Sequence, residues 1–322
     1  MSRYATDAEQ QAAQSRFRPV ASVPSDNPAK VDLHCHSNKS DGVMPPAELF
    51  QQMADCGMEV VALSDHDTMA GYRELRALIA EGAAGPRVIP AVEINSIADR
   101  ELIEMGVELE EGELHILGYG VDADDPDFLR ALESQRDARR IRLMMIIDAL
   151  RLLGKPIDDQ IAAVLESDEA LGRPHIARAM VAAGHVASVQ QAFDEWIDRK
   201  GPAYIPRQGM KSRAAIDAIA AAGGLSVLAH YPAASEQPEL IDLLVDWGLR
   251  GIEVYYRRFS PITVRQMEAL AARRGLVATG GTDYHGDNQT YVDARSTTEV
   301  PREVGDRLIE VLGTPRISGV RA

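Results

Sequence analysis

Two closely spaced histidines give the first indication of metal chemistry. In the segment VDLHCHS, His34 and His36 are separated by one residue. If this segment is a strand, its side-chain period of two places both imidazoles on one face together with Asp32. The alternate residues Val31, Leu33 and Cys35 then point the other way, into apolar packing. Two imidazoles on one face can chelate a metal ion, although a lone His-x-His pair is a weak signal.

Other histidines and carboxylates follow further apolar runs. They are Asp41 in SDGV, His66 in LSDHDT, Glu93 in VIPAVEINS, His115 in ELHILGY, His230 in VLAHYP, and Asp283 and His285 in TDYH. A glutamate that finishes a buried strand is costly unless it is paired or binds a metal. An acid beside a histidine, such as Asp65 beside His66, can orient the imidazole.

These residues favour one polynuclear metal site over several unrelated coincidences. In a parallel barrel the carboxyl ends of the strands meet on one face, where active sites are built. Imidazole and carboxylate ligands without thiolate favour manganese, zinc or iron over a structural zinc site. Cys35 faces the wrong way and is left out of the ligand set.

The elements that must position these ligands are short apolar runs separated by helical patterns. Strands are expected at 31–36, 59–64, 87–93, 114–119, 225–230, 251–256 and 276–282. Helices are expected between many of them, at 46–56, 70–81, 212–222, 237–247 and 261–274. Continuous apolar runs are typical of parallel strands buried on both faces. The alternation predicts an α/β fold, either an open sheet or a barrel.

The middle of the chain has a different pattern, with no strand expected between residues 122 and 203. Helices are expected at 127–153, 174–183 and 188–199. We therefore predict that residues 125–204 form a helical insertion in an α/β domain made of residues 30–124 and 205–322. The acidic stretch 101–113 is expected to be a solvated loop or hairpin.

Composition narrows the class of protein. The chain has 322 residues, of which 45% are hydrophobic and 26% charged, which is typical of a globular protein. With 34 basic and 49 acidic residues, a formal net charge of −15 disfavours a broad basic face for duplex nucleic acid but allows a small anionic substrate. Two cysteines make no disulfide framework and suit a reducing compartment.

No targeting or membrane segment is expected. Residues 1–29 lack the apolar core of a signal peptide and are predicted to be a flexible extension. No run approaches the roughly 18 apolar residues that a membrane span needs. The prediction is a cytoplasmic protein without a membrane partner.

Taken together, the motifs HCHS…D, SDHDT, VEIN, LHILGY, LAHYP and TDYH resemble the PHP (polymerase and histidinol phosphatase) family over nearly the whole chain beyond residue 30. The resemblance implies a distorted (β/α)7 barrel with two or three divalent metals, manganese first, with zinc or iron as alternatives. It implies three ligand sets: His34, His36, Glu93 and Asp283; Asp41, His66 and His285; and His115 and His230 with Glu93 bridging. All of these except His115 are also expected to be catalytic.

The resemblance is closest to a subgroup of 3′,5′-nucleoside bisphosphate phosphatases and 5′-3′ exoribonucleases that carries a helical insertion. The segments RRIRL, GRPHIAR and RKGPAYIPR support it. Arg140 is then expected to face a phosphate, and His175 and Tyr204 to contact the substrate. The residues alone leave other readings open: Arg140 is one of several helix arginines, with Arg136, Arg139 and Arg142 as neighbours, and His175 could cap a helix.

One position departs from the subgroup. Its members carry a lysine one place later than Lys200, where this chain has Gly201. Lys200 could reach the same phosphate from a shifted backbone, or Arg207 could replace it. The departure affects substrate preference and leaves the expected metal chemistry unchanged.

The expected function is metal-dependent hydrolysis of a terminal phosphoester. Nucleoside 3′,5′-bisphosphate would give nucleoside 5′-monophosphate and phosphate, and short RNA could be degraded from its 5′ end. His230 and His175 are both candidates to protonate the leaving oxygen. The alternatives are a histidinol-phosphate or other small-molecule phosphatase, a non-catalytic metal- or nucleotide-binding module, and a zinc amidohydrolase, which usually needs a lysine at a strand end.

Overall fold

Seven strands form the centre of the molecule. The computed structural model describes residues 30–313 except 108, 110–111, 168–169 and 287–288, so the extension 1–29 lies outside the described residues. The strands are β1 (Val31–Cys35), β2 (Val60–Leu63), β3 (Arg87–Ile97), β4 (Glu113–Tyr119), β5 (Leu225–Leu228), β6 (Gly251–Tyr256) and β7 (Val277–Gly281). All seven expected strands are present, and β3 extends further than its sequence pattern indicates.

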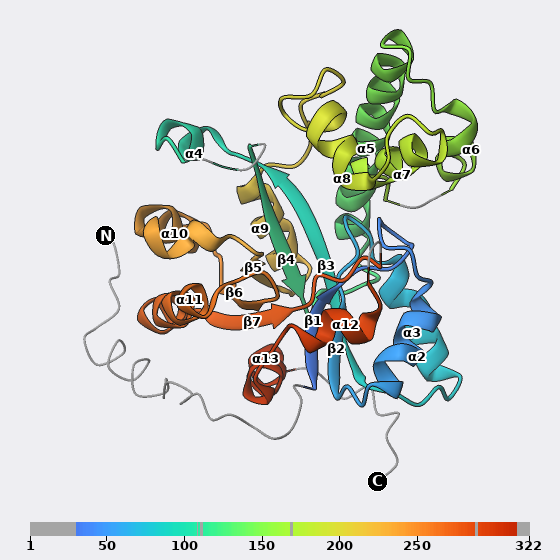
Figure 1. Cartoon of the computed structure of the whole chain (residues 1–322). Coiled ribbons are helices and arrows are strands. Elements are labelled where there is room, and N and C mark those ends of the chain that lie inside the picture. The colour runs from blue at the N-terminus through green and yellow to red at the C-terminus, as the bar shows by residue number, and fades with distance from the viewer. Residues whose placement is uncertain (1–29, 108, 110–111, 168–169, 287–288, 314–322) are drawn as a thin grey trace.

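The strands form a nearly closed barrel in the order in which they occur in the chain (Figure 1). A bridge between Cys35 and Tyr284 brings the ends of β1 and β7 together. Four neighbouring pairs are parallel, but β4 is antiparallel to both β3 and β5. The expectation of parallel strands is wrong for β4. The described residues between β3 and β4 contain the short helix α4 (Arg100–Glu104) and no long crossover helix, so the chain returns antiparallel.

Helices cover the outside of this barrel. Those between the strands are α2 (Pro46–Asp55), α3 (Ala70–Ala80), α9 (Ser212–Ala221), α10 (Pro238–Asp246) and α11 (Pro261–Arg274), preceded in one case by the 3₁₀ turn η3 (Pro232–Glu236). The five expected helices in these regions are confirmed. Two C-terminal helices, α12 (Tyr291–Ser296) and α13 (Arg302–Leu312), were not expected from the sequence.

An apolar cluster shared by all parts of the barrel anchors the ligand-bearing strands. It includes Leu33, Ala91 and Val227 from three strands and Val304 and Leu308 from α13. Where β1 and β7 meet, the space is too small for a side chain. A Cβ at Gly281 would lie 2.5 Å from the Cβ of His34, so glycine is required for the close approach.

The alternation along β1 is less regular than the sequence predicts. Val31 and Leu33 belong to one apolar cluster, whereas Cys35 belongs to another. The pairing of β1 with β2 shifts between Asp32 and Cys35, and such an irregularity changes which face the following residues occupy. Cys35 still faces apolar packing, and its thiol donates to the Ala62 carbonyl.

A second group of helices occupies the region between β4 and α9. It comprises α5 (Pro126–Leu152), α6 (Asp158–Leu165), α7 (Arg173–Ala182), α8 (Val189–Ala192) and the π-helical turn η2 (Phe193–Ile197). Figure 1 shows α5, α6, α7 and α8 gathered on one side of the barrel, at the upper right. They have an apolar cluster of their own, which includes Ile147, Ile161 and Met180. The single helix expected at 188–199 is instead one α-helical turn followed by a π-helical turn.

The acidic stretch 101–113 is not entirely solvated as predicted. Part of it forms α4, and Glu113 opens β4 with its side chain only 8% exposed. No helix among the described residues is long and apolar enough to cross a membrane.

Candidate metal centre

Nine histidine and carboxylate side chains meet at one end of the barrel. Their ligand atoms form three groups, each within 4.8 Å: His36, Asp41, His66 and His285; His34, His36, Glu93 and Asp283; and Glu93, His115 and His230. The structure thus brings together every residue predicted as a metal ligand. The groups match the implied sets, except that His36 also lies near the second set.

The strand ends explain this convergence. His34 lies in β1, and His66, His230 and Asp283 follow the carboxyl ends of parallel strands. His115 reaches the same end of the barrel by a different route, because it lies near the amino end of the antiparallel strand β4. Asp41 is carried by a loop in which Gly42 packs against the His36 backbone; a Cβ there would lie 2.4 Å from the His36 carbonyl oxygen.

Glu93 is at the centre of the cluster. Its Oε2 atom lies 3.1 Å from Nε2 of both His34 and His36 and 3.2 Å from Nδ1 of His66. Its Oε1 atom lies 2.9 Å from Nδ1 of His115 and 3.0 Å from Nε2 of His230. Glu93 is fully buried. The two oxygens of one carboxylate therefore face different histidines, which is the geometry of a bridging ligand.

Asp41 and Asp283 complete the other two groups. Asp283 Oδ1 lies 3.3 Å from His36 Nε2 and 3.5 Å from His34 Nε2. Asp41 lies 3.2 Å from His285 Nε2 and 3.6 Å from His66 Nε2. His115, His230 and His285 are 21–25% exposed, whereas the side chains of His34, His36 and Glu93 are fully buried. The cluster thus has a buried base and an open rim.

The residues present fit a divalent metal. Within the described part of the chain, His36 Nδ1 and Nε2, Asp41 Oδ1 and His66 Nδ1 are buried atoms without a hydrogen-bond partner. Orphaned polar atoms of this kind are costly, and a bound cation would satisfy them. Burial alone would raise the pKa of Glu93, but the neighbouring imidazoles of His34, His66 and His115 outweigh burial and hold it well below its usual value. Burial also lowers the pKa of His66 to about 3, whereas the neighbouring carboxylates outweigh burial at His36 and His115 and raise the pKa of these rings to about 10 and about 9.

Two residues of β6 support the cluster from behind. Glu253 is fully buried, and its Oε1 lies 2.9 Å from His34 Nδ1, which directs Nε2 of this imidazole toward Glu93. Its Oε2 accepts the His230 backbone N–H at 2.7 Å. The Tyr256 hydroxyl donates to Asp283 Oδ2 at 2.9 Å and leaves Oδ1 facing the histidines.

Backbone strain is concentrated at this end of the barrel. Among the described residues, the non-glycine residues with positive φ are Asp67 (51°), His230 (25°) and Asp283 (48°). Asp67 directly follows His66, and His230 and Asp283 lie two residues after the ends of β5 and β7. Such conformations persist only where the surrounding structure enforces them, and they are common at functional sites.

Asp32 and Asp65 lie beside the cluster with partners of their own. Asp32 accepts from the Thr282 hydroxyl and backbone N–H and from the Tyr291 hydroxyl. Asp65 accepts from Ser37 and Ser40. Its role is therefore to hold the loop that carries Asp41, whereas the sequence predicted that it orients the His66 imidazole.

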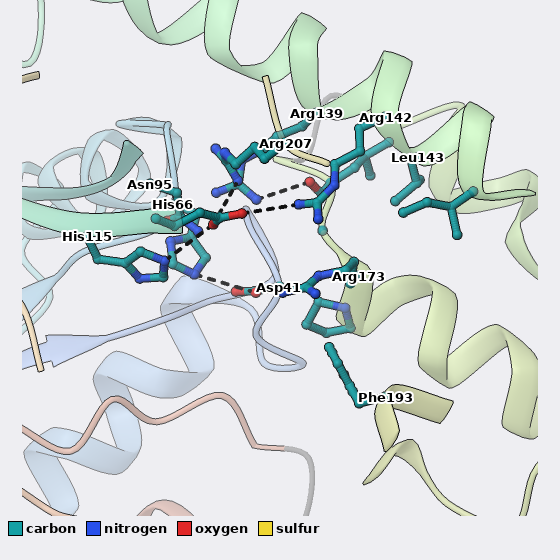
Figure 2. A pocket seen from close by; sticks show the side chains of 15 residues that line it. Asp41, His66, Asn95, His115, Arg139, Arg142, Leu143, Arg173, Phe193 and Arg207 are labelled. Carbon is teal, nitrogen blue, oxygen red and sulfur yellow. Dashed lines mark hydrogen bonds and ion pairs between the residues drawn. The ribbon is translucent and has the colours of Figure 1, made fainter. Parts of the chain in front are cut away.

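A pocket of about 160 Å³ opens beside the cluster (Figure 2). Its lining from the barrel is Asp41, His66, Asn95, Glu113 and His115. Its lining from the second group of helices and the following segment is Arg139, Arg142, Leu143, Ile146, Leu171, Gly172, Arg173, Pro174, Phe193 and Arg207. Four arginines therefore face a centre rich in carboxylates and imidazoles.

Two acids with buried side chains, Asp67 and Glu113, fix three of these arginines in place. Asp67 Oδ2 accepts from Arg139 Nε at 2.5 Å and from Arg207 Nη2 at 3.2 Å. Glu113 lies 3.5 Å from Arg142 Nη1 and 3.9 Å from Arg207 Nη1. Burial and the neighbouring Arg139 lower the pKa of Arg207 to about 10. Crowded guanidinium groups of this kind favour an anion in the pocket.

None of the four predicted substrate residues lines this pocket. Arg140 does not line it, because its guanidinium donates to the Leu165 and Ser167 carbonyls at the end of α6. Lys200 is exposed and also lies outside the lining. Tyr204 approaches indirectly, with its ring 5.7 Å from the Arg142 guanidinium carbon.

His175 occupies the cap position that the sequence left open. The Gly172 backbone N–H donates to His175 Nδ1 at 3.1 Å, at the start of α7. Burial lowers the pKa of His175, so the ring is neutral and can accept this bond. The neighbouring Arg178 donates to the Asp41 carbonyl at 2.6 Å, which joins α7 to the loop that carries a predicted ligand.

Sequence reasoning missed the residues that hold these groups in place. Glu113 precedes His115 by two residues in the same strand, and this spacing could have indicated that both share a face. Glu253 is a carboxylate within the apolar run GIEVYY, the signal that drew attention to Glu93. No sequence signal distinguished Arg139 from its neighbours Arg136, Arg140 and Arg142.

Comparison with known proteins identifies the family of the chain. The PHP domain family matches residues 32–147. A 3′,5′-nucleoside bisphosphate phosphatase from Chromobacterium violaceum is 30% identical over 278 residues, which cover 85% of this chain and 93% of that protein. A 5′-3′ exoribonuclease from Haemophilus influenzae is 32% identical over 260 residues, covering 80% and 90% of the two chains.

Solved structures show the same relationship. A protein from Bifidobacterium adolescentis, described as a metal-dependent phosphoesterase, superposes with a TM-score of 0.75 at 28% identity, covering 90% of this chain and 99% of the other. The histidine and carboxylate cluster, the seven-stranded barrel and these similarities agree. The chain belongs to the PHP family and is a metal-dependent phosphoesterase.

Proposed function

We propose that this enzyme removes the 3′-phosphate from a nucleoside 3′,5′-bisphosphate, with two or three divalent metals held by the nine clustered residues. Manganese is the proposed metal, with zinc or iron as alternatives. His34, His36, Glu93 and Asp283 would hold one ion, and Asp41, His66 and His285 a second. Glu93 would bridge to a third ion on His115 and His230.

The observation that carries this proposal is the pair of arginines beside the cluster. Arg139 Nη2 and Arg207 Nε are buried atoms without a hydrogen-bond partner among the described residues, and both side chains line the pocket. Their side chains are 6% and 4% exposed. Two buried guanidinium groups with unused donors match a second phosphate, which arginine binds well in a fixed fork geometry. A substrate with one phosphate on the cluster and another on these arginines is a bisphosphate.

The residues of the chain would act mainly by positioning. Bound metals would supply Lewis-acid stabilisation of the phosphoryl oxygens and an activated water. Glu253 and Tyr256 hold His34 and Asp283 in the orientations described above. Asp67 holds Arg139 and Arg207 in place, so that the second phosphate meets donors that need no rearrangement.

The helical insertion, which we place at residues 125–204 within a barrel domain of residues 30–124 and 205–322, would cover the active site. It supplies Arg139 and Arg142 as well as Phe193 to the pocket. A covered pocket favours a small nucleotide or the end of a short oligonucleotide. The C. violaceum relative is a bisphosphate phosphatase and the H. influenzae relative a 5′-3′ exoribonuclease, so RNA remains the second candidate substrate.

Phosphate release from the manganese-loaded protein tests the proposal. The substrates are adenosine 3′,5′-bisphosphate, adenosine 3′-monophosphate, histidinol phosphate and a short 5′-phosphorylated RNA. We expect the bisphosphate to have the highest kcat/KM, with at least a tenfold advantage over the 3′-monophosphate because the second phosphate meets charged donors. Equal rates for the two nucleotides, or release from histidinol phosphate alone, would contradict it.

A further inference from the structure

The pocket changes character along its length. Its barrel side is lined by His66 and His115, and the arginines form its middle. The insertion adds the apolar side chains of Leu143, Ile146 and Phe193 to the lining. Figure 2 shows Leu143 and Phe193 on the opposite side of the pocket from His66 and His115. Arg142 and Arg207 lie between the histidines and Leu143, and Asp41 and Arg173 lie between the histidines and Phe193. The histidine side and the arginines of the pocket can bind the phosphates of a substrate. Phosphate binding does not explain the apolar side chains on the remaining side.

Phe193 reaches the pocket from an unusual backbone. It is the first residue of η2, a π-helical turn that directly follows α8. Single π-helical turns are rare and occur frequently at functional sites. The Phe193 side chain is partly exposed and packs against the apolar cluster of the insertion, which fixes its position.

An arginine lies against the Phe193 ring. The guanidinium carbon of Arg173 is 5.4 Å from the ring centroid. Asp198 holds this guanidinium through Nη1 at 3.2 Å, so the arrangement does not depend on a ligand. Phenyl rings and guanidinium planes are the two surfaces on which proteins stack nucleobases. Leu171 and Pro174 add apolar contact beside them.

We infer that this apolar zone binds the base of the nucleotide, with Phe193 as its stacking surface. The inference rests on the proposed function, because it places the base at the end of a pocket whose other zones hold the two phosphates. Stacking depends on the flat face that every base has, so the zone would select nucleotides over base-free sugar phosphates without selecting one base.

The experiment compares adenosine 3′,5′-bisphosphate with its base-free analogue, 1-deoxyribose 3,5-bisphosphate, in the manganese-loaded enzyme. Phe193→Leu removes the aromatic face and keeps an apolar side chain in the insertion core, and Phe193→Trp restores an aromatic face. Trp196→Leu is the control, because Trp196 belongs to the same π-helical turn but lies outside the pocket lining. Inhibition by adenosine 5′-monophosphate and by ribose 5-phosphate gives a binding readout independent of turnover.

We expect Phe193→Leu to lower kcat/KM about tenfold for the nucleotide and to leave the base-free substrate unchanged. Phe193→Trp should restore the preference, and Trp196→Leu should not alter it. Adenosine 5′-monophosphate should lose about tenfold in affinity in Phe193→Leu, and ribose 5-phosphate none.

Three results would overturn the inference alone. They are an equal loss on both substrates, no loss on either, or the same loss in Trp196→Leu. In each of these the wild-type enzyme still hydrolyses the bisphosphate, so the proposed function stands. A wild-type enzyme that hydrolyses neither bisphosphate would overturn both.

Discussion

The barrel end and the insertion each contribute charged side chains to the same site, but the positions of these side chains are determined differently. The barrel residues are the proposed metal ligands, and their positions follow from strand ends that must meet. The insertion residues are arginines, two of which lie on the long helix α5, where docking against the barrel decides which arginines point inward. Arg139 is buried in the pocket and Arg140 bonds to carbonyls of the insertion, although they are adjacent. The comparison teaches that the proposed metal ligands can be recognised from strand ends in the sequence, whereas the proposed phosphate-binding residues depend on how the insertion packs against the barrel.

The largest effect is expected for His36→Ala, since His36 belongs to two of the three ligand groups. We expect at least a roughly 10³-fold loss of turnover, the scale of lost electrostatic stabilisation, together with reduced metal content. Metal analysis and phosphate release measure both effects. Cys35→Ser is the matched control, because the neighbouring thiol faces the Ala62 carbonyl and serine can make the same bond. Full metal loading in His36→Ala would show that the cluster is not the metal centre.

The second largest effect is expected on the free energy of unfolding and concerns Asp67, the barrel acid that pairs with Arg139 of the insertion. Asp67→Asn keeps the left-handed backbone that Asn tolerates but removes the charge that pairs with Arg139 and Arg207. Because this leaves buried guanidinium groups without a counter-charge, we expect urea unfolding to give about 3 kcal/mol less stability. Asp124→Asn, at an exposed pair with Arg73 and Arg76, should cost under about 1 kcal/mol. Similar losses of stability in the two variants would contradict the expectation that the buried ion pairs contribute more than the exposed ones.

A smaller effect separates the two neighbouring arginines of α5. Arg139→Met should raise KM for the bisphosphate by about 10- to 100-fold, since it removes charged hydrogen bonds to the second phosphate, and leave metal content unchanged. Arg139→Lys, which keeps a cation beside Asp67, controls for folding. Arg140→Met should change KM less than about twofold. The reverse ranking would restore the sequence prediction for Arg140 and contradict the orientation of α5.

The smallest expected effect concerns Lys200. This side chain is exposed and lies outside the pocket lining, with Arg207 buried inside it instead. Lys200→Ala should therefore leave kcat/KM for the bisphosphate within about twofold. A tenfold loss in the same assay would indicate that the turn at 198–203 moves over the substrate.

Much of the barrel could be predicted because apolar runs and their polar ends mark buried strands. His66, His230 and Asp283 each follow such a run, and parallel strands bring their ends together. The direction of β4 could not be predicted, since its apolar run has the same appearance in either orientation. His115 still reaches the cluster because the reversed strand presents its amino end there.

The supporting residues were harder to predict for a physical reason. Glu253 and Glu113 act through partners on distant parts of the chain, His34 in one case and Arg142 and Arg207 in the other. The insertion adds a further difficulty, because a helix with many arginines has no local feature that marks its inward face. Phe193 was not singled out either, since the π-helical turn that presents it is not visible in an apolar pattern.

The most direct measurement of the central claim is a manganese titration of chelator-treated protein, with metal bound per chain and phosphate release from adenosine 3′,5′-bisphosphate followed together. Because two of the three ligand groups share His36 and two share Glu93, we predict that at least two ions bind per chain and that turnover appears as the second ion binds. Full turnover in the metal-free protein, or saturation with no more than one ion per chain, would contradict the account.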